Sequence, residues 1–590
     1  MNSDNRKEKF VIANCSGFFG DRFSAAREMV SGGKIDVLTG DYLAELTMAI
    51  LYRSLLKDPK KGYVRTFLKQ MEEILGSCLD RKIRVVTNAG GLNPEGLAEE
   101  LEKKAKIVGV NPTIACITGD DLMPGLNELE KQGECFRHSD DGVSLKKAGG
   151  MPITANAYTG AWGIVKALEQ GADIVVGGRI ADAALVAGPA AWKFGWRKND
   201  WDRLAGGYLA GHIIECGTQA TGGNYSFIDE VPLFKNMGFP IAEVYEDGSF
   251  VITKHPKTGG LVSVGTVTAQ LLYEIREPCY LTPDVRVCFD SVNMEQEAKD
   301  RVLVNNVRGE SPTGNIKVCI NNFCGYRNSM TVILTGLDIE KKAKIVEQAI
   351  FESMGGKDEF EVADVQLIRS DKADPKTNEE SFAYLRICVM DRDEKKVGRV
   401  FSSKVVEMAL GSIPGFTLTH PPAKASPAIC HWPALVSGRH VEQKVVVGRN
   451  EFIVKSVLPE NNRAKRFTPT INRIKTVNHK MVKIALGRVF ATRSGDKGGN
   501  ANLGIWGKTD MEYAYLNEFL TIDKLKELLP DIKEFEVERY ELPNLFALNF
   551  YIKGMLGKGV SAGLRIDPQA KTLGEYLRAK EIEVPYEIVH

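Results

Sequence analysis

The sequence predicts an α/β protein with three parts: an N-terminal domain on a largely parallel sheet, a middle α+β domain and a small C-terminal ferredoxin-like α+β domain. Three observations lead to this prediction. Short apolar runs alternate with helical stretches up to about residue 200, as in parallel α/β sheets. The pattern then changes to hairpins and longer strands. Residues 481–590 read as strand, helix, two strands and helix, an order typical of a ferredoxin-like sandwich.

The composition is that of an ordinary globular protein. The 590 residues are 43% hydrophobic and 26% charged, and 77 basic residues balance 76 acidic ones to a net charge of +1. This balance gives no reason to expect a nucleic-acid or membrane surface. No apolar run reaches the roughly 18–20 residues of a membrane helix, and the stretch MNSDNRKEKF lacks the apolar core of a signal peptide. We therefore expect a cytoplasmic protein.

Eleven cysteines are scattered along the chain without a CxxC pair. Their odd number and irregular spacing favour reduced thiols over a disulfide framework. The eight histidines form no HExxH or HxH pattern. The turn GFFGDR precedes a helical stretch but matches neither GxGxxG nor a Walker loop. The sequence therefore predicts no resident cofactor and assigns no metal ligands.

In the N-terminal domain, expected over residues 1–225, six apolar runs read as buried parallel strands because their apolar residues are continuous rather than alternating. They lie in segments 9–17, 35–45, 81–91, 112–122, 151–160 and 172–182. Each run ends on its carboxyl side in glycine with Asp, Asn, Thr or Arg. Ligands of open parallel sheets bind at that edge, so we expect these polar residues to line one crevice.

The expected crevice residues divide by chemistry. Carboxylates are candidates for acid–base catalysis, and amides, hydroxyls and guanidinium groups for binding substrate. The catalytic candidates here are Asp41 and Asp120. The substrate-binding candidates are Asn14, Ser16, Asn88, Asn156 and Arg179. The alternative explanation is that these residues only cap the loops of the sheet.

Residues 201–225 supply a further acid–base pair. His212 and Glu215 stand three positions apart and share one face if this piece is helical. A histidine beside a carboxylate suits proton transfer, so both residues are catalytic candidates. A purely structural, hydrogen-bonded pair is the alternative.

The middle domain is expected over residues 226–435. The stretch EVYEDGSFVITKHP reads as a hairpin that turns at Asp-Gly. GNIKVCINNFCGYRNSMTVILTG reads as two strands, and GLDIEKKAKIVEQAIFESMG as an amphipathic helix. Residues 436–480 are polar and basic, and we interpret them as a linker.

The first strand of the C-terminal domain ends in the polar, glycine-rich stretch RSGDKGGNANLG, residues 493–504. Glycine lets a ligand approach the main chain, and Arg493 and Lys497 can hold an anion. We expect this loop to dock onto the N-terminal crevice, with Asp496 orienting one cation and Asn500 holding the turn; all four are substrate-binding candidates. A turn that only caps its own backbone is the alternative.

Several longer motifs resemble the acyclic terpene utilisation (AtuA-like) family. In the first half of the chain they are NCSGFFGDR, TGDYLAELTM, NAGGLNP, GGRIADAAL and GHIIECGTQATGGNY. RSGDKGGNANLGI is similar to the C-terminal ferredoxin-fold domain of that family. The resemblance covers nearly the whole chain. It implies a role beside enzymes that degrade citronellol- and geraniol-type acids as coenzyme A thioesters, but it implies no particular reaction.

We therefore predict an enzyme of acyl-CoA or small carboxylic acid catabolism. Lyase, hydratase or hydrolase chemistry on a branched or terpenoid acyl substrate needs a base, an oxyanion clamp and an anion-binding loop. Coenzyme A enters as part of the substrate. We expect a small anionic substrate, a homo-oligomer, and neither nucleic-acid nor membrane partners.

Two alternatives stay open. One is a non-catalytic assembly or partner-binding subunit of a catabolic pathway, whose mark is an exposed apolar patch. The other is an enzyme that uses a divalent metal held by the carboxylates of Asp41, Asp120 and Asp121.

Overall fold

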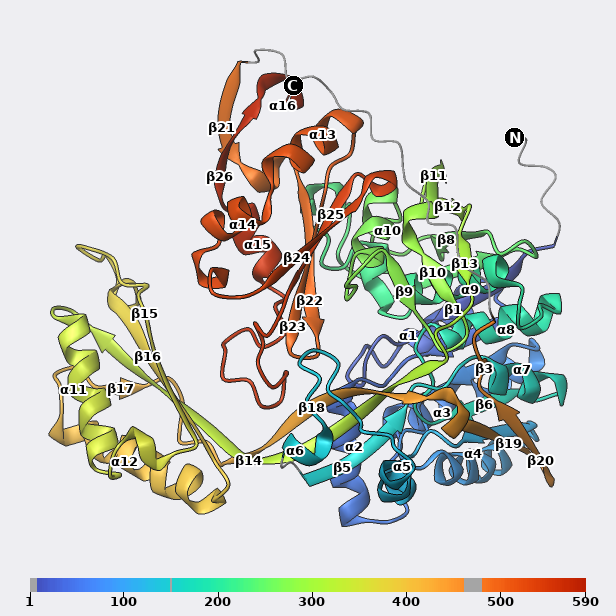
Figure 1. Ribbon diagram of the computed structural model, residues 1–590, viewed down its shortest axis with the longest axis horizontal. Coiled ribbons are helices and arrows are strands. Elements are labelled where there is room, and N and C mark those ends of the chain that lie inside the picture. Colours follow the sequence, from blue (N-terminus) through green and yellow to red (C-terminus); the bar gives the residue numbers. More distant parts are fainter. Residues whose placement is uncertain (1–7, 149–150, 461–479, 590) are drawn as a thin grey trace.

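The computed structural model describes residues 8–148, 151–460 and 480–589 (Figure 1). Its largest unit within these residues is an 11-stranded sheet. The central strands are parallel: β1 (Phe10–Asn14), β2 (Val37–Gly40), β3 (Arg84–Thr87), β6 (Ile174–Gly177) and β4 (Ile114–Thr118). Antiparallel strands flank them: β7 (Pro240–Val244), β8 (Phe250–Lys254), β12 (Arg301–Asn305) and β11 (Asn293–Ala298) beside β1, and β19 (Glu442–Val447) and β20 (Asn450–Lys455) beside β4. The α/β fold class is confirmed.

Helices cover both faces of this sheet because alternate strand residues point to opposite sides. Val11 and Ala13 of β1 pack with α1 (Ala25–Gly32), α3 (Arg65–Asp80) and α4 (Pro94–Val108). Phe10 and Ile12 pack on the other face with α7 (Trp162–Glu169), α8 (Ala184–Phe194) and α9 (Trp201–Ile214). The parallel strands are therefore buried on both sides, which explains their continuous apolar runs.

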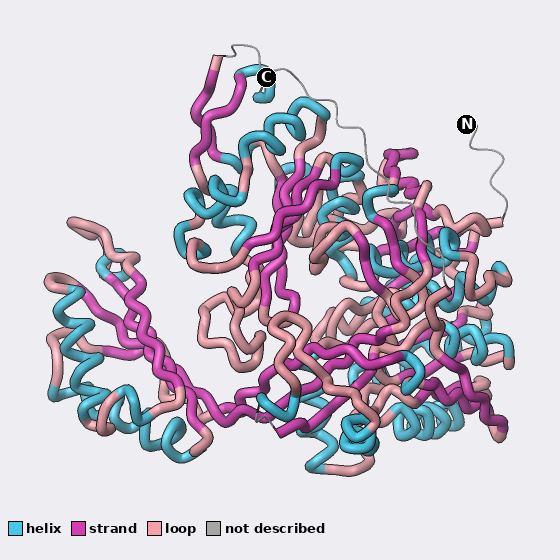
Figure 2. Tube along the Cα trace, in the orientation of Figure 1, coloured by secondary structure: helices cyan, strands magenta, loops and turns pink. Residues whose placement is uncertain are grey.

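A second sheet is built on β14 (Asn315–Thr335), a strand of 21 residues. Its first half pairs with β5 (Met151–Ala157) and β18 (Ser426–Ser437), and its second half pairs with β16 (Phe382–Asp391) and β17 (Thr417–Leu418). With β15 (Val362–Ile368), α11 (Ile339–Glu352) and α12 (Phe401–Gly411), the second half forms the lobe at the left of Figure 1. Figure 2 shows β14 running from this lobe into the main body.

Two strand predictions in this region are wrong. The stretch 314–336 forms one strand instead of two, because Gly325, with φ +110°, lets β14 bend without ending. The run at 151–160 was expected as a parallel strand of the main sheet, but β5 is an antiparallel partner of β14. Its first residues are exposed or half-buried, unlike the wholly buried central strands. The hairpin predicted at Asp-Gly is confirmed by β7 and β8.

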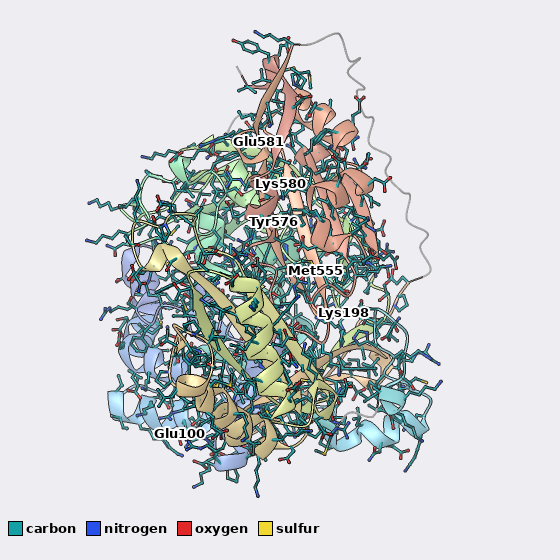
Figure 3. All side chains as sticks on the ribbon, turned by 90° about the vertical axis from the view of Figure 1, so that its left-hand side faces the viewer. Glu100, Lys198, Met555, Tyr576, Lys580 and Glu581 are labelled. Atoms are coloured by element: carbon teal, nitrogen blue, oxygen red, sulfur yellow. A yellow bond between two sulfur atoms is a disulfide. The ribbon has the colours of Figure 1, made fainter. Side chains whose placement is uncertain are left out.

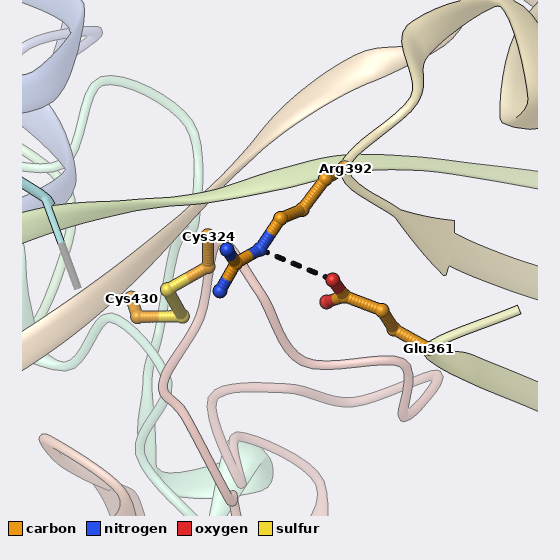
Figure 4. Close-up of a disulfide and its surroundings, with 4 residues drawn as sticks. All are labelled: Cys324, Glu361, Arg392 and Cys430. Atoms are coloured by element: carbon orange, nitrogen blue, oxygen red, sulfur yellow. Dashed lines mark ion pairs between the residues drawn. A yellow bond between two sulfur atoms is a disulfide. The ribbon is translucent and has the colours of Figure 1, made fainter. Parts of the chain in front are cut away.

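A disulfide joins β14 to β18 between Cys324 and Cys430, whose Cα atoms are 6.0 Å apart (Figure 4). The expectation of reduced thiols is therefore wrong for this pair, although the other nine described cysteines are free. Asn322 lies opposite Cys430, and a register shift after Phe323 places Cys324 beside it as well. The two cysteines are 106 residues apart in sequence, so only the strand pairing brings them together.

The C-terminal domain is confirmed as a ferredoxin-like α+β unit. Its sheet has the order β22 (Ala491–Lys497), β23 (Asn500–Trp506), β25 (Ala547–Ile552) and β24 (Val537–Leu542). It carries α13 (Asp510–Phe519), α14 (Ile522–Leu528) and α15 (Leu573–Arg578), and β21 (Met481–Ala485) pairs with β26 (Glu581–Pro585), followed by α16 (Tyr586–Val589). In the turned view of Figure 3 this domain, with Tyr576 and Lys580, stands at the opposite end from Glu100.

The stretch RSGDKGGNANLG is a β-hairpin, so the prediction of a polar loop after a strand is wrong. β22 and β23 pair from Ala491 opposite Trp506 to Lys497 opposite Asn500. Only Gly498 and Gly499 form the turn, and Gly498 has φ +64°, as the first residue of a two-residue hairpin turn requires. The polar residues of the two strands make hydrogen bonds to other parts of the chain, such as that of Asn502 with Glu274, which is why a strand can carry them.

The predicted domain limits remain predictions, but the main sheet crosses them. β7, β8, β11 and β12 come from the expected middle domain. β19 and β20 occupy part of the segment 436–480 that was expected to be a linker, and Gln443, Val445 and Val447 alternate inward. β19 pairs with β4 and extends the main sheet, so residues 442–455 belong to that sheet and do not form a linker. Residues 461–479 of the expected linker lie outside the described residues.

Shorter elements complete the description. They are α2 (Glu45–Lys57), α5 (Leu126–Lys131), α6 (Leu145–Ala148), α10 (Val264–Leu271), β9 (Cys279–Leu281), β10 (Arg286–Cys288) and β13 (Arg308–Glu310). In the part of the chain that the structure describes, no helix has the length and apolar character to cross a membrane.

Candidate functional site

The carboxyl ends of the parallel strands place five of the expected polar residues at one edge of the sheet. Each directly ends or follows a central strand, and none is more than 6% exposed. They are Asn14, Asp41, Asn88, Asp120 and Arg179. Asn156 joins them from β5, because its backbone bridges Asp121 and its amide reaches Asp120. The structure brings these six residues together, and their roles in binding or catalysis remain predictions.

Asp41 is a buried carboxyl group fixed by two donors. Its Oδ1 accepts hydrogen bonds from Asn88 Nδ2 at 2.5 Å and from the backbone N–H of Leu43 at 3.1 Å. Burial raises the pKa of Asp41 well above its ordinary value, and the nearby carboxylates of Asp182 and Glu215 raise it further. Asn88 therefore orients Asp41, and the environment of Asp41 favours its protonated form more than water does.

Arg179 is held on its backbone by one acid and on its side chain by another. Asp120 Oδ2 accepts from the Arg179 N–H and from Asn156 Nδ2, both at 2.8 Å. The guanidinium pairs with Asp182 and lies over the Tyr158 ring, 4.0 Å from its centroid. Burial raises the pKa of Asp120 to about 6. In this structure Asp120 positions the strand end that carries Arg179.

His212 and Glu215 lie at the end of α9, so the condition for their sharing one face, that this piece is helical, is met. The His212 Nε2–H donates to the Leu271 carbonyl oxygen at 3.2 Å, so Nδ1 carries the lone pair; it lies 3.6 Å from Glu215 Oε1. Burial lowers the pKa of His212 to about 4, which leaves the ring neutral at pH 7. The ring packs on Tyr280 and Phe289, with centroids 4.9 and 5.6 Å away.

Glu215 is a second buried carboxyl group with a raised pKa. Burial is the main cause, and the carboxylates of Asp182 and Glu274 add to it. Asn14 Nδ2 donates to the carbonyl oxygens of Ile214 and Glu215 at 2.6 and 2.9 Å, which fixes the end of the helix. Four buried polar atoms at this edge have no hydrogen-bond partner among the described residues: Asn156 Oδ1, Arg179 Nε, His212 Nδ1 and Glu215 Oε2. A polar ligand bound here can supply the missing hydrogen-bond partners of these atoms.

The second sheet closes the cluster from the opposite side. Lys317 of β14 lies 3.2 Å from Glu45 Oε1, which also accepts from the Tyr158 hydroxyl at 2.7 Å. His431 Nε2 of β18 lies 3.7 Å from the same oxygen. Burial by itself raises the pKa of Glu45, but the charges of Lys317, His431 and Arg179 together hold it well below its ordinary value. Glu45 is therefore ionised at neutral pH.

Several of these residues were missed from the sequence. Glu45, Tyr158 and Asp182 stand within a few positions of strand-end motifs, so the motif segments contained a signal for them. Lys317 and His431 are single residues in antiparallel strands far along the chain. No local pattern marks them, because only the pairing of β5, β14 and β18 brings them to the parallel sheet.

The C-terminal hairpin contributes Lys497 to the cluster. Its ammonium lies 5.9 Å from the centroid of Tyr280. Burial lowers the pKa of Lys497, as does the charge of Lys317, while Glu274, Glu45 and Glu215 oppose the shift. The turn of the hairpin lies beside β18, because a Cβ atom added at Gly498 would lie 3.6 Å from the His431 ring. Figure 1 shows β22 and β23 pointing toward that strand.

Arg493 and Lys497 lie against different aromatic rings. The Arg493 guanidinium lies over Tyr273, 4.3 Å from the ring centroid, and Tyr273 packs against Gly495 between the two cations. Asp496 lies 3.5 Å from the Lys571 ammonium, and burial, together with the charge of Glu274, raises the pKa of Asp496 to about 7. The binding of a substrate anion by Arg493 and Lys497 stays a prediction.

Two further candidates are occupied by contacts within the chain. Ser16 Oγ donates to the Phe18 carbonyl oxygen at 3.1 Å. Asn500 Nδ2 donates to the Tyr551 hydroxyl at 2.7 Å and to Asp140 at 2.8 Å, and its Oδ1 accepts from the Gly554 N–H at 2.8 Å. Asn500 therefore ties the hairpin to its neighbours instead of facing the cluster.

The cluster has the groups for acid–base chemistry on an anion. Asp41 and Glu215 are carboxyl groups with raised pKa values, Glu45 is an ionised carboxylate, and Arg179 and Lys317 are fixed cations. Within residues 8–148, 151–460 and 480–589, no group of three or more His, Cys, Asp or Glu side chains is arranged to hold a metal ion.

Comparison with known proteins identifies the family. The family described as "Acyclic terpene utilisation family protein AtuA" matches residues 10–447, and the "AtuA ferredoxin-like domain" matches residues 484–583. A search of curated proteins found no match. The first of the two family matches spans well over half of the chain and includes every strand-end motif described above. The chain therefore belongs to the AtuA family of acyclic terpene utilisation proteins.

Proposed function

We propose that this protein is an enzyme of acyl-CoA or small carboxylic acid catabolism that acts as a lyase, hydratase or hydrolase on a branched or terpenoid acyl substrate. The observation that carries the proposal is the buried pair Asp41 and Glu215. Besides burial, the charge of Glu215 raises the pKa of Asp41, and Asp182 raises the pKa of both. In such a carboxyl pair one member holds a proton while the other is ionised, so we assign to the pair the roles of general acid and general base.

The cations supply the second requirement of the chemistry. Arg179 of the main sheet acts on both members of the carboxyl pair, and Lys497 of the C-terminal domain acts on Glu215. Lys317 of the second sheet lies 3.2 Å from the neighbouring Glu45. Positive charge fixed in a buried site stabilises the negative charge that develops on a carbonyl oxygen. The same groups account for an anionic substrate.

The proposed reaction removes and delivers one proton. The ionised carboxylate takes the proton from the carbon next to the substrate carbonyl, and the electron pair of that C–H bond forms the new double bond. For a β-hydroxyacyl group, the C–O bond breaks and the protonated carboxyl group gives its proton to the departing hydroxyl. The products are an unsaturated acyl group and water, and hydration is the reverse.

The role in acyclic terpene utilisation follows from the family, and coenzyme A enters with the substrate. A cytoplasmic location, a homo-oligomeric assembly and the absence of a resident cofactor stay predictions. A partner-binding subunit and a divalent-metal-dependent enzyme stay the alternatives that the sequence allows.

Proton exchange tests the proposal without knowledge of the full reaction. The protein is incubated in D₂O with 3-methylbutanoyl-CoA and, separately, with 3-methylbutanoate, and the α-proton signal is followed by NMR. We expect the wild type to exchange this proton and Asp41→Asn and Glu215→Gln to slow the exchange by about 10²- to 10⁴-fold, the usual contribution of a general acid or base. Both substitutions keep the shape of the side chain.

The control is Glu295→Gln, which removes an exposed carboxylate on β11. It should leave the exchange rate unchanged. Exchange at the wild-type rate in both Asp41→Asn and Glu215→Gln, or no exchange of either compound by the wild type, would show that the carboxyl pair does not perform this chemistry.

A further inference from the structure

A cavity lies between the main body and the C-terminal domain, away from the residues of the carboxyl pair. It has a volume of about 810 Å³ and is lined by residues 224–230 of the main body and by parts of β22 and α15 of the C-terminal domain. This volume is in the range of pockets that enclose small molecules, roughly 300–1,000 Å³. None of the proposed acid–base groups lines it.

Arg493 lines this cavity and is nine-tenths buried, with 8% of its surface exposed. Its guanidinium stacks on Tyr273, but among the described residues no group accepts a hydrogen bond from it or pairs with its charge. The neighbouring Arg578, in contrast, pairs with Glu575 at 2.8 Å and donates to the Gly487 carbonyl oxygen. A buried charge without a partner is costly, so the position of Arg493 is explained by an anion that binds in the cavity.

The acidic residues of the lining do not neutralise Arg493. Glu230 pairs with Lys508 and accepts from the Tyr225 hydroxyl, and Glu575 pairs with Arg578. Asp229 is exposed. Lys571 also lines the cavity, but its ammonium lies 3.5 Å from Asp496 and 3.9 Å from Glu274. Arg493 and the exposed Arg488 are therefore the cations of the lining that no acid of the described residues pairs with.

The walls also suit an aromatic base. Tyr225 and Phe227 line the cavity, with ring centroids 5.9 Å apart and ring planes at 81° to one another. Ser226 holds this segment to β22, because its Oγ donates to the Thr492 carbonyl oxygen at 2.6 Å and accepts from the Thr492 N–H at 3.0 Å. Lys508 and Arg578 lie over the Phe227 ring, 4.3 and 5.6 Å from its centroid. The ring of Tyr225 is therefore left for a nucleotide base, since aromatic faces stack on such bases.

We propose that this cavity binds the nucleotide end of a coenzyme A thioester, with Arg493 as the anchor of a phosphate group. The proposal rests on the proposed function, because it takes the carboxyl pair as the place of the acyl group. Arg493 and Lys497 stand four positions apart on β22, or about 13 Å at about 3.3 Å per residue. A ligand with a long arm between its phosphates and its acyl group can therefore occupy both sites, passing Tyr273.

Binding of the isolated nucleotide tests the cavity alone. Calorimetric titrations of the full chain use adenosine 3′,5′-bisphosphate, inorganic pyrophosphate and succinate. We expect the wild type to bind the bisphosphate, Arg493→Gln to weaken its binding at least tenfold, and Arg493→Lys to fall between them. Arg565→Gln is the control, since Arg565 pairs with Asp531 in the same domain and does not line the cavity. Circular dichroism establishes that each variant is folded.

The outcomes separate this proposal from the previous one. Glu215→Gln should bind the bisphosphate as the wild type does, so a failure of proton exchange leaves the nucleotide site intact. Should Arg493→Gln fail to fold, Arg493→Lys decides: wild-type affinity in that variant counts against a guanidinium-anchored phosphate. Succinate binding without bisphosphate binding, or no binding of any of the three probes by the wild type, overturns the proposal.

Discussion

At the scale of single residues, burial decides which polar groups are able to act. Asn14, Asn88 and Asp120 are buried with their hydrogen bonds made to the chain, and each fixes a neighbour. Arg179 and His212 are buried as deeply, and the Glu215 side chain is 11% exposed. Each of these three residues keeps a polar atom without a partner among the described residues. The same strand-end chemistry thus divides into residues that hold the site and residues that are free to meet a ligand.

Asp120 provides a test of this division through pH. Its pKa is raised from 3.8 to about 6, so between these values the folded state binds more protons than the unfolded state, and stability falls as pH rises. Asp120→Asn lacks this loss. The free energy of unfolding of the variant, relative to that of the wild type, should therefore rise by on the order of 3 kcal/mol between pH 4 and pH 7, since one pKa unit is worth about 1.4 kcal/mol.

Urea denaturation of both proteins at intervals between pH 4 and pH 7 measures the difference. Effects of all other titrating groups cancel because both proteins share them. A difference in unfolding free energy that does not change with pH would mean that Asp120 is not a buried, proton-binding carboxyl group.

At the scale of secondary structure, close backbone contacts position the helix that carries the acid–base pair. In α9, a Cβ atom added at Gly206 would lie 1.9 Å from the carbonyl oxygen of Gly248 in the turn between β7 and β8. The end of the same helix is held by Asn14. His212 and Glu215 are therefore placed by contacts at two points of one rigid element.

Two glycine substitutions in helices should have opposite effects. Gly206→Ala should destabilise the protein by about 1–3 kcal/mol because the methyl group meets backbone that cannot move aside. Gly76→Ala, in the middle of α3 with nothing within 4 Å of the added Cβ, should stabilise it by roughly 0.5–1 kcal/mol. Urea titrations at one pH give both values. Equal effects of the two substitutions would contradict the close contact at Gly206.

At the scale of the whole molecule, three parts of the chain build one site. The main sheet supplies Asp41 and Arg179, the second sheet supplies Lys317, and the C-terminal domain supplies Lys497. Docking of the C-terminal domain depends on buried amides: Asn502 accepts from the Glu274 N–H at 2.9 Å, and Asn549 donates to the Arg276 carbonyl oxygen at 2.7 Å. The strongly polar hairpin is thereby explained as an interface within the chain.

Asn549→Ala should loosen this docking. The substitution removes the hydrogen bonds to Asn502 and to the carbonyl oxygens of Ile275 and Arg276, and each buried group left unpaired costs about 1–3 kcal/mol. Hydrogen exchange should speed up at 274–276 and in the hairpin 491–506. Asn450→Ala, at the exposed first residue of β20, is the control. Equal protection of 274–276 in Asn549→Ala and wild type would refute the docking role.

The sequence by itself determined the class of the fold and the edge of the sheet where the site lies. Buried parallel strands need continuous apolar runs and end in polar turns, so both features are local and readable at Asp41, Asn88 and Arg179. The helix that pairs His212 with Glu215 is local in the same way. The motifs also identified the family correctly.

Only the tertiary structure decided which polar residues face one another. Lys317 and His431 reach the cluster through pairing between strands that are far apart in sequence, and the hairpin of Lys497 reaches it through docking of a separate domain. The separation of Arg493 from Lys497 depends on Tyr273, which enters from another part of the chain. Local patterns record the backbone conformation of a segment, whereas charge pairing and burial depend on contacts between segments, and these exist only once the chain has folded.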